Sequence, residues 1–191
     1  MTRKVTYSMG MSLDGYIVGP DGGFQWTAPD DELFRFAMDQ IREVGVHLMG
    51  RHLYEAMLHW ENVAGGPGLS DAEREWISLW NPLPKLVFSR TLTTLRGNAR
   101  LATGSLREEI TRLRAAPEAG NIAIGGATLA TAAAADDLVD EYRPKIHPVL
   151  VGGGTPFFPH HERRVDLELL ETRTFPTGVT YLRQRVLRAS G

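Results

Sequence analysis

Short apolar runs recur along the first two thirds of the chain, and segments with helical spacing lie between most of them. Aliphatic residues dominate each run, and glycine, proline or serine ends it, which is the pattern of short strands. The pattern therefore predicts strands at residues 5–9, 15–18, 44–49, 85–89 and 121–124.

The segments between these runs carry helix signals. After Pro29, apolar residues recur at helical spacing behind an acidic first turn, which suits the helix dipole. Ser70 and Ser105 each precede a glutamate by three residues, which is the capping-box signature of a helix start. One predicted helix starts after Pro29, and four others cover residues 51–58, 70–79, 105–115 and 127–135.

The last third of the chain has a different pattern. Residues 139–151, 165–175 and 179–187 are long and strand-like, and the turn Pro176-Thr177-Gly178 joins the last two as a hairpin. Strands that alternate with helices favour a parallel sheet, whereas a hairpin requires antiparallel neighbours. We therefore expect an α/β fold with a mostly parallel central sheet, antiparallel C-terminal strands and helices on both faces.

Composition and charge limit the classes of protein to which this chain can belong. A chain of 191 residues with 42% hydrophobic content suffices for one packed core, so we expect a single domain over residues 1–191. With 21 basic and 23 acidic residues, the net charge of −2 lacks the basic surplus of a nucleic-acid-binding protein. Nucleic acid is therefore not an expected partner.

Cysteine is absent from the chain, which excludes disulfides, thiolate metal sites and thiol catalysis and favours a cytoplasmic location. Polar residues and glycine interrupt residues 5–11, so we expect no signal peptide. No apolar run approaches the ~20 residues of a membrane helix. The sequence predicts a soluble cytoplasmic protein without membrane contact.

A strand-to-helix junction at Gly50 is the first candidate binding element. The apolar run 44–49 ends at Gly50 and passes at once into Arg51-His52 and a helix-compatible segment. Glycine permits close approach of an anion, the helix start offers unpaired amides, and Arg51 adds a planar fork for phosphate oxygens. A glycine-containing turn of this kind also occurs where no ligand binds, so the junction alone decides nothing.

Two further junctions have the same form. Gly125-Gly126 follows an apolar strand and opens a helix at Ala127-Thr128-Leu129, where an open α/β sheet places a pyrophosphate. The three spaced glycines of the Rossmann fingerprint are missing, and tight strand–helix packing explains the pair equally well. Ser89-Arg90 ends another strand and suits the 2′-phosphate of NADP, although an exposed loop arginine is the simpler interpretation.

Asp31 is the candidate acid. Trp26 and Phe34 flank it with aromatic surface, and the helical spacing of Leu33, Phe34 and Met38 places residue 31 near the inner face. The neighbouring acids at positions 30 and 32 are expected to lean outward. A carboxylate there could assist proton delivery during a hydride transfer, and the alternative is a helix N-terminal charge.

The histidines give no metal site. His160 and His161 are adjacent, and neighbouring side chains in an extended segment point apart. His47, His59 and His147 have no companion at metal-ligand spacing. We expect no bound metal. The three tryptophans at positions 60, 76 and 80 fit either a core or a dimer seam.

With these residues, the chain resembles the dihydrofolate reductase-like superfamily. Within it, the resemblance is to the bacterial group that includes the reductase domain of the bifunctional riboflavin-biosynthesis deaminase-reductase. The segment Trp26-x-x-Pro29-x-Asp31 is similar to the segment of dihydrofolate reductase in which a tryptophan and a substrate-binding acid flank a proline. The segment from Met49 to Glu55 resembles the cofactor-phosphate junction, and Ile124-Gly125-Gly126 resembles the paired glycines beside the pyrophosphate.

Other segments are closer to the riboflavin reductases. They are Asp140-Glu141, the stretch from Pro148 to Pro156, and Met11-Ser12-Leu13-Asp14-Gly15. Two positions depart from the dihydrofolate reductase pattern, since Gln25 replaces a proline and Leu53 replaces a hydroxyl residue. Folate specificity is therefore open.

The resemblance implies a three-layer dihydrofolate reductase-like fold and an NADPH-dependent reductase that forms a homodimer through its C-terminal strands. Its substrate would be a small heterocycle, pteridine-like or a ribosylaminopyrimidine, with a reaction like that of 5-amino-6-(5-phosphoribosylamino)uracil reductase. Dihydrofolate reductase and a non-catalytic nucleotide-binding module are the alternatives. The implied catalytic residues are Asp31 and Trp26, and the implied cofactor-binding residues are Gly50, Arg51, His52, Ser89, Arg90, Gly125, Gly126, Ala127, Thr128 and Leu129.

Overall fold

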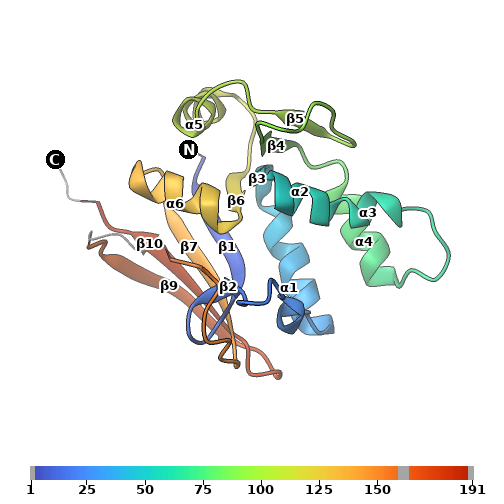
Figure 1. The fold of residues 1–191 in the computed structure, drawn as a ribbon, viewed down its shortest axis with the longest axis vertical. Helices are drawn as coiled ribbons and strands as arrows, with labels where there is room; N and C mark the ends of the chain where they lie inside the picture. Colours follow the sequence, from blue (N-terminus) through green and yellow to red (C-terminus); the bar gives the residue numbers. More distant parts are fainter. Residues whose placement is uncertain (1–2, 159–163, 189–191) are drawn as a thin grey trace.

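An eight-stranded mixed sheet forms the centre of the computed structural model, which describes residues 3–158 and 164–188 (Figure 1). The strand order is β5-β4-β3-β6-β1-β7-β10-β9, and β2 and β8 form a separate two-stranded sheet. The strands are β1 (Val5–Ser12), β2 (Tyr16–Val18), β3 (Val44–Gly50), β4 (Lys85–Phe88), β5 (Ala99–Leu101), β6 (Asn121–Gly125), β7 (Glu141–His147), β8 (Thr155–Pro156), β9 (Leu167–Thr174) and β10 (Thr180–Val186).

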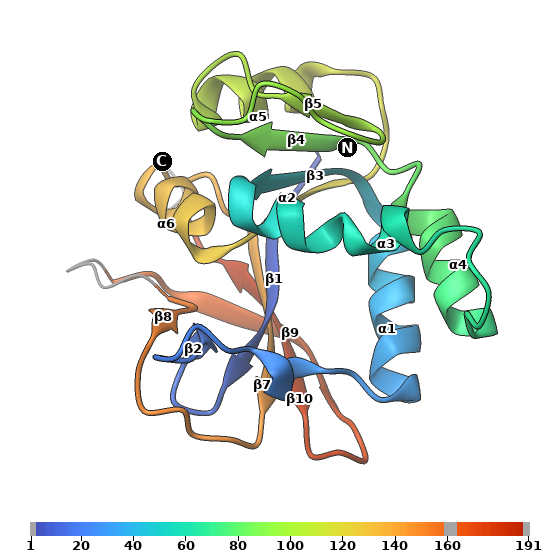
Figure 2. The same cartoon turned by 45° about the vertical axis from the view of Figure 1, so that its right-hand side comes forward.

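The sheet is parallel from β5 to β7, and β10 and β9 are antiparallel, as the sequence predicts. Helices cover both of its faces (Figures 1 and 2). The helical elements are a 3-10 turn η1 (Gln25–Thr27), α1 (Asp31–Arg42), α2 (Arg51–Met57), α3 (His59–Asn62), α4 (Asp71–Trp80), α5 (Leu106–Ala115) and α6 (Ala127–Ala135).

The two faces of the sheet belong to different core clusters. On the face covered by α5 and α6, alternate residues of the central strands are apolar and fully buried, among them Val5, Leu48 and Ile122. On the other face, α1 and α4 pack on Met49 and Val87. A smaller cluster joins α1 to the β9–β10 side through Leu33, Phe36, Phe175, Val179 and Tyr181.

The tryptophan-rich segment contributes to the core. The rings of Trp76 and Trp80 are stacked 5.7 Å apart with an interplanar angle of 9°. Both side chains are buried, and Trp60 packs against them with its ring centroid 5.9 Å from that of Trp76. Burial in the α1–α4 cluster therefore accounts for these residues.

Several short elements escaped sequence prediction. The strands β5 and β8, the turn η1 and the helix α3 contain two to four residues each, too few to show a period. The strand predicted at residues 139–151 is shorter than expected, since β7 ends at His147. Pro148 and the glycines at 152–154 follow it, and all three glycines have a positive φ.

The helix N-termini fall into two groups. Asp30, Ser70 and Ser105 cap α1, α4 and α5 through their side chains, and both predicted capping boxes are present. By contrast, α2 and α6 start at Gly50 and Gly126, and no side chain caps either helix. The amides of these two helix starts are therefore left for water or a ligand. Within the described ranges, no helix has the length and apolarity needed to cross a bilayer.

Candidate cofactor and substrate site

The three predicted junctions meet at one edge of the sheet. Met49 pairs with Gly125 across β3 and β6, and Gly50 pairs with Phe88 across β3 and β4. The strands are parallel, so Gly50, Ser89 and Gly126 follow the carboxyl ends of three adjacent strands. Helices α2 and α6 both start at this edge (Figure 2). An open parallel sheet binds its ligands at this kind of edge.

Glycine is required at the two positions of the second junction, Gly125 and Gly126, for different reasons. A Cβ added at Gly125 would lie 2.3 Å from Leu53 Cδ2 and 2.7 Å from His47 Cε1, so close packing requires this glycine. Gly126 has a φ of 89°, which other residues rarely adopt, and an added Cβ would meet no atom within 4 Å. Packing explains Gly125, whereas Gly126 leaves open space in front of α6.

Helix α6 presents its first turn to this space. No side chain caps the amides of Ala127, Thr128 and Leu129. The Leu129 side chain is buried in the core, 3.8 Å from the position a Cβ would take at Gly50. Leu129 can therefore contribute to an anion site only through its backbone, while the Thr128 side chain is exposed.

Arg51 and His52 stand on the exposed side of α2. The Arg51 guanidinium lies 3.1 Å from His52 Nε2 and 3.9 Å from a carboxylate oxygen of Glu55. Both members of the Arg51–Glu55 pair are exposed, and such pairs hold a side chain weakly. Arg51 is therefore able to turn toward an anion at the sheet edge.

Ser89 is already engaged in its own turn. Its hydroxyl oxygen accepts hydrogen bonds from the amides of Thr91 (3.2 Å) and Leu92 (3.1 Å). Arg90 is exposed, and within the described part of the chain no carboxylate forms an ion pair with it. This junction thus offers a fixed turn and one exposed cation, which fits both interpretations drawn from the sequence.

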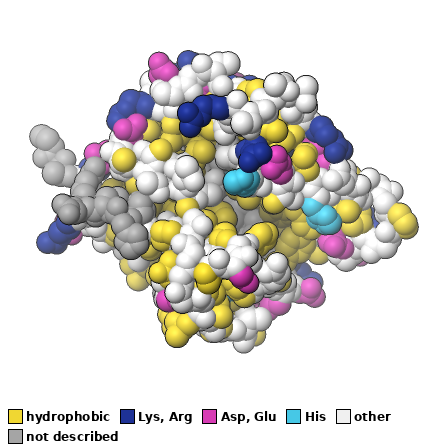
Figure 3. All heavy atoms as spheres, viewed as in Figure 1, with side chains coloured by type: hydrophobic (Ala, Val, Ile, Leu, Met, Phe, Trp, Pro, Cys, Tyr) yellow, Lys and Arg dark blue, Asp and Glu magenta, His cyan; other side chains and the backbone are white. Residues whose placement is uncertain are grey.

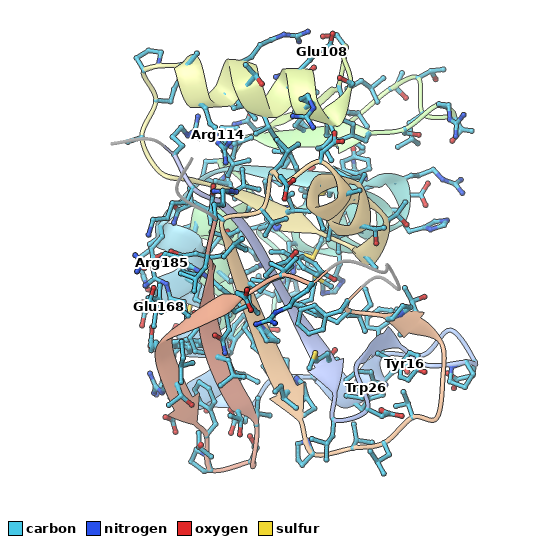
Figure 4. All side chains as sticks on the ribbon, turned by 90° about the vertical axis from the view of Figure 1, so that its left-hand side faces the viewer. Tyr16, Trp26, Glu108, Arg114, Glu168 and Arg185 are labelled. Carbon is cyan, nitrogen blue, oxygen red and sulfur yellow. The ribbon has the colours of Figure 1, made fainter. Side chains whose placement is uncertain are left out.

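A hollow opens below this edge, between the α2–α3 segment and the segment of β2 and η1 (Figure 3). Hydrophobic side chains line much of it, and two histidine side chains lie along its upper margin. The turn η1, which carries Trp26, lies against β1, since a Cβ added at Gly10 would be 3.1 Å from Thr27 Cγ2; Figure 4 labels Trp26. The Trp26 ring meets the His147 ring edge-on, with centroids 5.7 Å apart. This contact ties η1 to the end of β7.

The acidic residues at the start of α1 differ from the expected arrangement. Asp30 is the N-cap, and its carboxylate accepts from the Leu33 amide at 2.8 Å. Asp30 also lines a cavity of about 220 Å³ together with Trp26 and His147. Asp31 is exposed, and Glu32 pairs with Arg173 at 2.7 Å.

The expectation that Asp31 lies nearest the inner face and Asp30 leans outward is therefore wrong. The cause is local, because an N-cap residue has extended dihedrals and leaves the helical period. Asp30, with φ −75° and ψ 178°, turns its side chain back over the helix start. The catalytic role assigned to Asp31 stays a prediction.

A row of polar residues on β7 forms part of the α1 face and was missed by sequence reasoning. Its members alternate with Tyr142, Pro144 and Ile146, and this alternation was the available signal. The row extends into a cluster of charges near the C-terminal end of α1, in which Lys4 and Glu43 are exposed and the other members are buried or half-buried. We call this set the β7 ion cluster, and it consists of Lys4, Glu43, Glu141, Arg143, Lys145 and Arg183.

Glu141 is the centre of this cluster. Its carboxylate, which is fully buried, accepts from Lys4 at 2.7 Å, from Arg143 at 2.8 Å and from Arg183 at 2.8 Å. Burial by itself raises the pKa of Glu141, but the hydrogen bonds from Arg183, Lys4 and Arg143 outweigh it and lower the pKa to about 2. Glu141 is therefore ionised at any physiological pH.

Asp14 joins two motifs that lie far apart in the sequence. Its carboxylate accepts from the amides of Val151 and Gly152, at 3.2 and 2.7 Å. A hydrogen bond from Ser12 is the main cause that lowers the pKa of Asp14, and the two amides act in the same direction. The loop after β1 and the glycine-rich loop after β7 thus form one unit, which explains why both motifs occur together.

The histidines do not form a metal site in the described ranges. No group of three potential ligands is found there, and His160 and His161 lie outside the described residues. Burial lowers the pKa of His47 to about 4 and also lowers the pKa of His147, which Lys145 depresses further. Both rings are therefore neutral at pH 7.

The fold is that of a dihydrofolate reductase-like α/β protein, and two helices start without side-chain caps at one edge of its sheet. The chain belongs to the RibD C-terminal domain family, whose model matches residues 3–181. This is a family of reductases. The uncharacterized protein YyaP of Bacillus subtilis (strain 168) is 31% identical over 180 residues, which cover 94% of this chain and 93% of YyaP.

Solved structures share the fold. RibD of Acinetobacter baumannii matches with a TM-score of 0.69 and 17% identity, over 98% of this chain and 59% of RibD. Dihydrofolate reductase of Enterococcus faecalis, solved in complex with NADP(H), matches with a TM-score of 0.63 and 13% identity. That match covers 98% of this chain and all of the reductase. The fold expected from the sequence is confirmed.

Proposed function

We propose that the protein is an NADPH-dependent reductase that acts on a carbonyl or C=N bond of a small heterocyclic substrate. The observation that carries this proposal is the convergence of Gly50, Ser89 and Gly126 at one edge, where two helices start without side-chain caps. Membership of a reductase family supports it.

The residues present fit the phosphates of a dinucleotide. The positive φ of Gly126 and the empty space at its Cβ position permit close approach to the first turn of α6. Arg51 would neutralise phosphate charge from the side of α2, and Arg90 would pair with a 2′-phosphate. When bound, NADPH supplies the hydride, and the protein supplies orientation and electrostatic support.

A substrate of the riboflavin-biosynthesis type, such as 5-amino-6-(5-phosphoribosylamino)uracil, is our first choice. The unit formed by Asp14 and the loop at Val151–Gly152 favours it, since both of its motifs resemble the riboflavin reductases. Dihydrofolate is the second choice, on the strength of the Trp26 segment. A homodimer through the C-terminal strands remains part of the proposal.

Fluorescence titration of NADPH tests the cofactor site. Arg51→Gln is expected to weaken NADPH binding about tenfold, the usual cost of one charge-assisted hydrogen bond. Arg74→Gln is the matched control, because Arg74 pairs with Asp71 on α4, whose capped start is not part of the edge. No binding to the wild-type protein at millimolar NADPH would refute the proposal.

Turnover separates the remaining alternatives. NADPH oxidation with the phosphoribosylaminouracil but not with dihydrofolate supports the first choice, and the reverse supports the second. NADPH binding without oxidation of either substrate supports a non-catalytic module. Asp31→Asn and Asp30→Asn then test whether either carboxylate takes part in proton transfer, because asparagine retains the N-cap at position 30 and only a loss of proton transfer lowers kcat.

A further inference from the structure

Lys145 is a half-buried cation without a carboxylate partner in the described part of the chain. Its Nζ donates to the Ser8 hydroxyl at 3.0 Å, and that hydroxyl donates to the Arg143 carbonyl at 3.2 Å. An ammonium group has three protons, and this contact uses one of them. Two donors of Lys145 are therefore available to a ligand.

The surroundings of Lys145 carry an excess of positive charge. The β7 ion cluster contains four cations, and Glu141 and Glu43 are its two carboxylates. Glu141 is shared by Lys4, Arg143 and Arg183, and Glu43 pairs with Arg143 at 3.0 Å. Two positive charges are thus left uncompensated, and they favour a ligand that is anionic or that becomes anionic during reaction.

Lys145 also lies beside the proposed cofactor edge. Tyr7 pairs with Ile124, so the next residues in register, Ser8 and Gly125, are level on adjacent strands. Neighbouring strands are about 4.8 Å apart. The Lys145 side chain reaches Ser8 from the next strand on the other side, and it is not sealed from solvent.

We propose that Lys145 is the catalytic acid of this site and that its ammonium group holds the oxygen of a carbonyl-bearing, anionic substrate. The proposal rests on the proposed reductase function. As hydride reaches the carbonyl carbon, the C=O π pair moves to oxygen, an O–H bond forms and one N–H bond of Lys145 breaks. The neutral amine that remains takes a proton from water.

The electrostatics suit this role. Burial is the main cause that lowers the pKa of Lys145 to about 8, and the nearby Arg143 lowers it further. The group therefore carries its proton at pH 7 and releases it readily, which is the condition for an efficient general acid. The titratable and charged groups around it are Arg143, His147 and Glu141 on β7, Tyr181 and Arg183 on β10, Asp30 and Glu43 at the ends of α1, and Lys4 before β1.

Chemical labelling tests access to Lys145 without a known substrate. The chain contains only three lysines, so a modified peptide identifies its residue directly. Pyridoxal 5′-phosphate is an anionic aldehyde that forms an imine with a neutral lysine, and borohydride fixes the imine for mass spectrometry. We expect labelling at Lys145 to be fastest and to rise between pH 7 and pH 9, well ahead of labelling at Lys4.

Kinetics test the proton transfer. Lys145→Arg keeps the positive charge but cannot give up a proton, so kcat with the phosphoribosylaminouracil is expected to fall about 100-fold or more. Its NADPH affinity is expected to stay within about twofold of the wild type, since Lys145 is not among the phosphate-binding residues. Lys4→Arg makes the same change elsewhere in the cluster and is expected to keep kcat.

The outcomes separate the two proposals. Failure of the wild-type protein to bind NADPH removes the reductase function, and the labelling result is independent of it. A wild-type kcat in Lys145→Arg, or labelling at Lys145 no faster than at Lys4, overturns the assignment of Lys145. A fall in kcat at high pH that persists in Lys145→Arg also overturns it.

Discussion

The two faces of the central sheet differ in the charge that they carry. On the α5–α6 face, the residues of β1, β3 and β6 are apolar and buried, and they pack on α5 and α6. The α1 face is apolar at β3 and β4. At β7, which pairs with β1, it presents the alternate residues Glu141, Arg143, Lys145 and His147. The α5–α6 face therefore stabilises the fold through apolar burial, whereas the β7 part of the α1 face holds charge.

This difference shows that the chain tolerates a cost in folding free energy on the α1 face of the sheet. Burial of charges is expensive, and an apolar replacement is often neutral or stabilising. A net positive cluster is therefore poorly suited to stability alone, whereas it is well suited to an anionic ligand. The contrast between the faces is consistent with a site built on the α1 side.

Loss of the central carboxylate should have the largest effect. Glu141→Gln leaves Lys4, Arg143 and Arg183 without their shared partner, and the expected loss of unfolding free energy is about 3–5 kcal/mol, as for a broken buried pair. Urea unfolding at pH 7 measures it. Glu168→Gln is the control, because Glu168 pairs with Arg185 at the exposed outer strands (Figure 4), where such pairs contribute about 0–1 kcal/mol.

The lowered pKa of Glu141 also predicts that the stabilisation it provides is lost at acidic pH. The folded pKa of Glu141 lies near 2, below its ordinary value of 4.5, so its stabilising contribution is complete above pH 4.5 and is lost as pH falls toward 2. The difference between wild type and Glu141→Gln should therefore shrink over this window. A difference that is constant with pH would contradict the assigned role of Glu141.

An apolar deletion on the opposite face should cost somewhat less. Leu48 is fully buried in the α5–α6 cluster, and Leu48→Ala is expected to lower the unfolding free energy by about 3 kcal/mol through the cavity it leaves. This loss should be independent of pH between 2 and 9, unlike that of Glu141→Gln. Leu13→Ala is the control, since Leu13 is 64% exposed and should change stability by less than about 0.5 kcal/mol.

Replacement of Lys145 by an apolar residue should raise the unfolding free energy, in contrast to the two preceding substitutions. Burial lowers its pKa from 10.5 to about 8, so the folded state binds this proton less tightly than the unfolded state does. Below pH 8 the full penalty applies, and Lys145→Met is expected to be more stable than the wild type by about 1–3 kcal/mol. Between pH 8 and 10.5 the wild type gains stability and the difference closes.

Urea unfolding at pH 7 and pH 10 tests this prediction, and comparison of the two proteins cancels the other titrating groups. A Lys145→Met protein that is less stable at pH 7 would show that the cluster is balanced by contacts and not strained by its charge. Gain of stability with loss of turnover would identify the trade-off typical of a functional site.

Much of the fold and of the cofactor edge follows from the sequence for a simple reason. Strand–helix alternation fixes a parallel sheet, and the carboxyl ends of parallel strands share one edge, so Gly50, Ser89 and Gly126 had to meet. Capping boxes at Ser70 and Ser105 are local signals and were predicted correctly. These features depend on short-range patterns or on topology.

The α1 face depends on register and on single-residue boundaries. Lys145 contacts Ser8 because β7 lies beside β1, a pairing between residues 137 positions apart that no local pattern encodes. The exchange of Asp30 for Asp31 arose from a helix start displaced by one residue, which is the least predictable feature of a helix. The polar alternation of β7 was visible, but its partners were not.

The smallest predicted effect tests whether the α5–α6 face is purely apolar. The hydroxyl of Tyr7 is buried there, and no hydrogen-bond partner is found for it among the described residues. Its ring stacks on Phe157 at 4.3 Å, so Tyr7→Phe keeps the packing and removes an unsatisfied polar group. The expected change is a gain of about 1 kcal/mol in unfolding free energy.

Tyr54→Phe is the matched control, because the Tyr54 hydroxyl accepts from the Arg96 amide at 2.6 Å and its removal should cost about 1 kcal/mol. Equal losses in the two variants would mean that Tyr7 has a partner such as an ordered water, and that this face, too, contains a satisfied polar site.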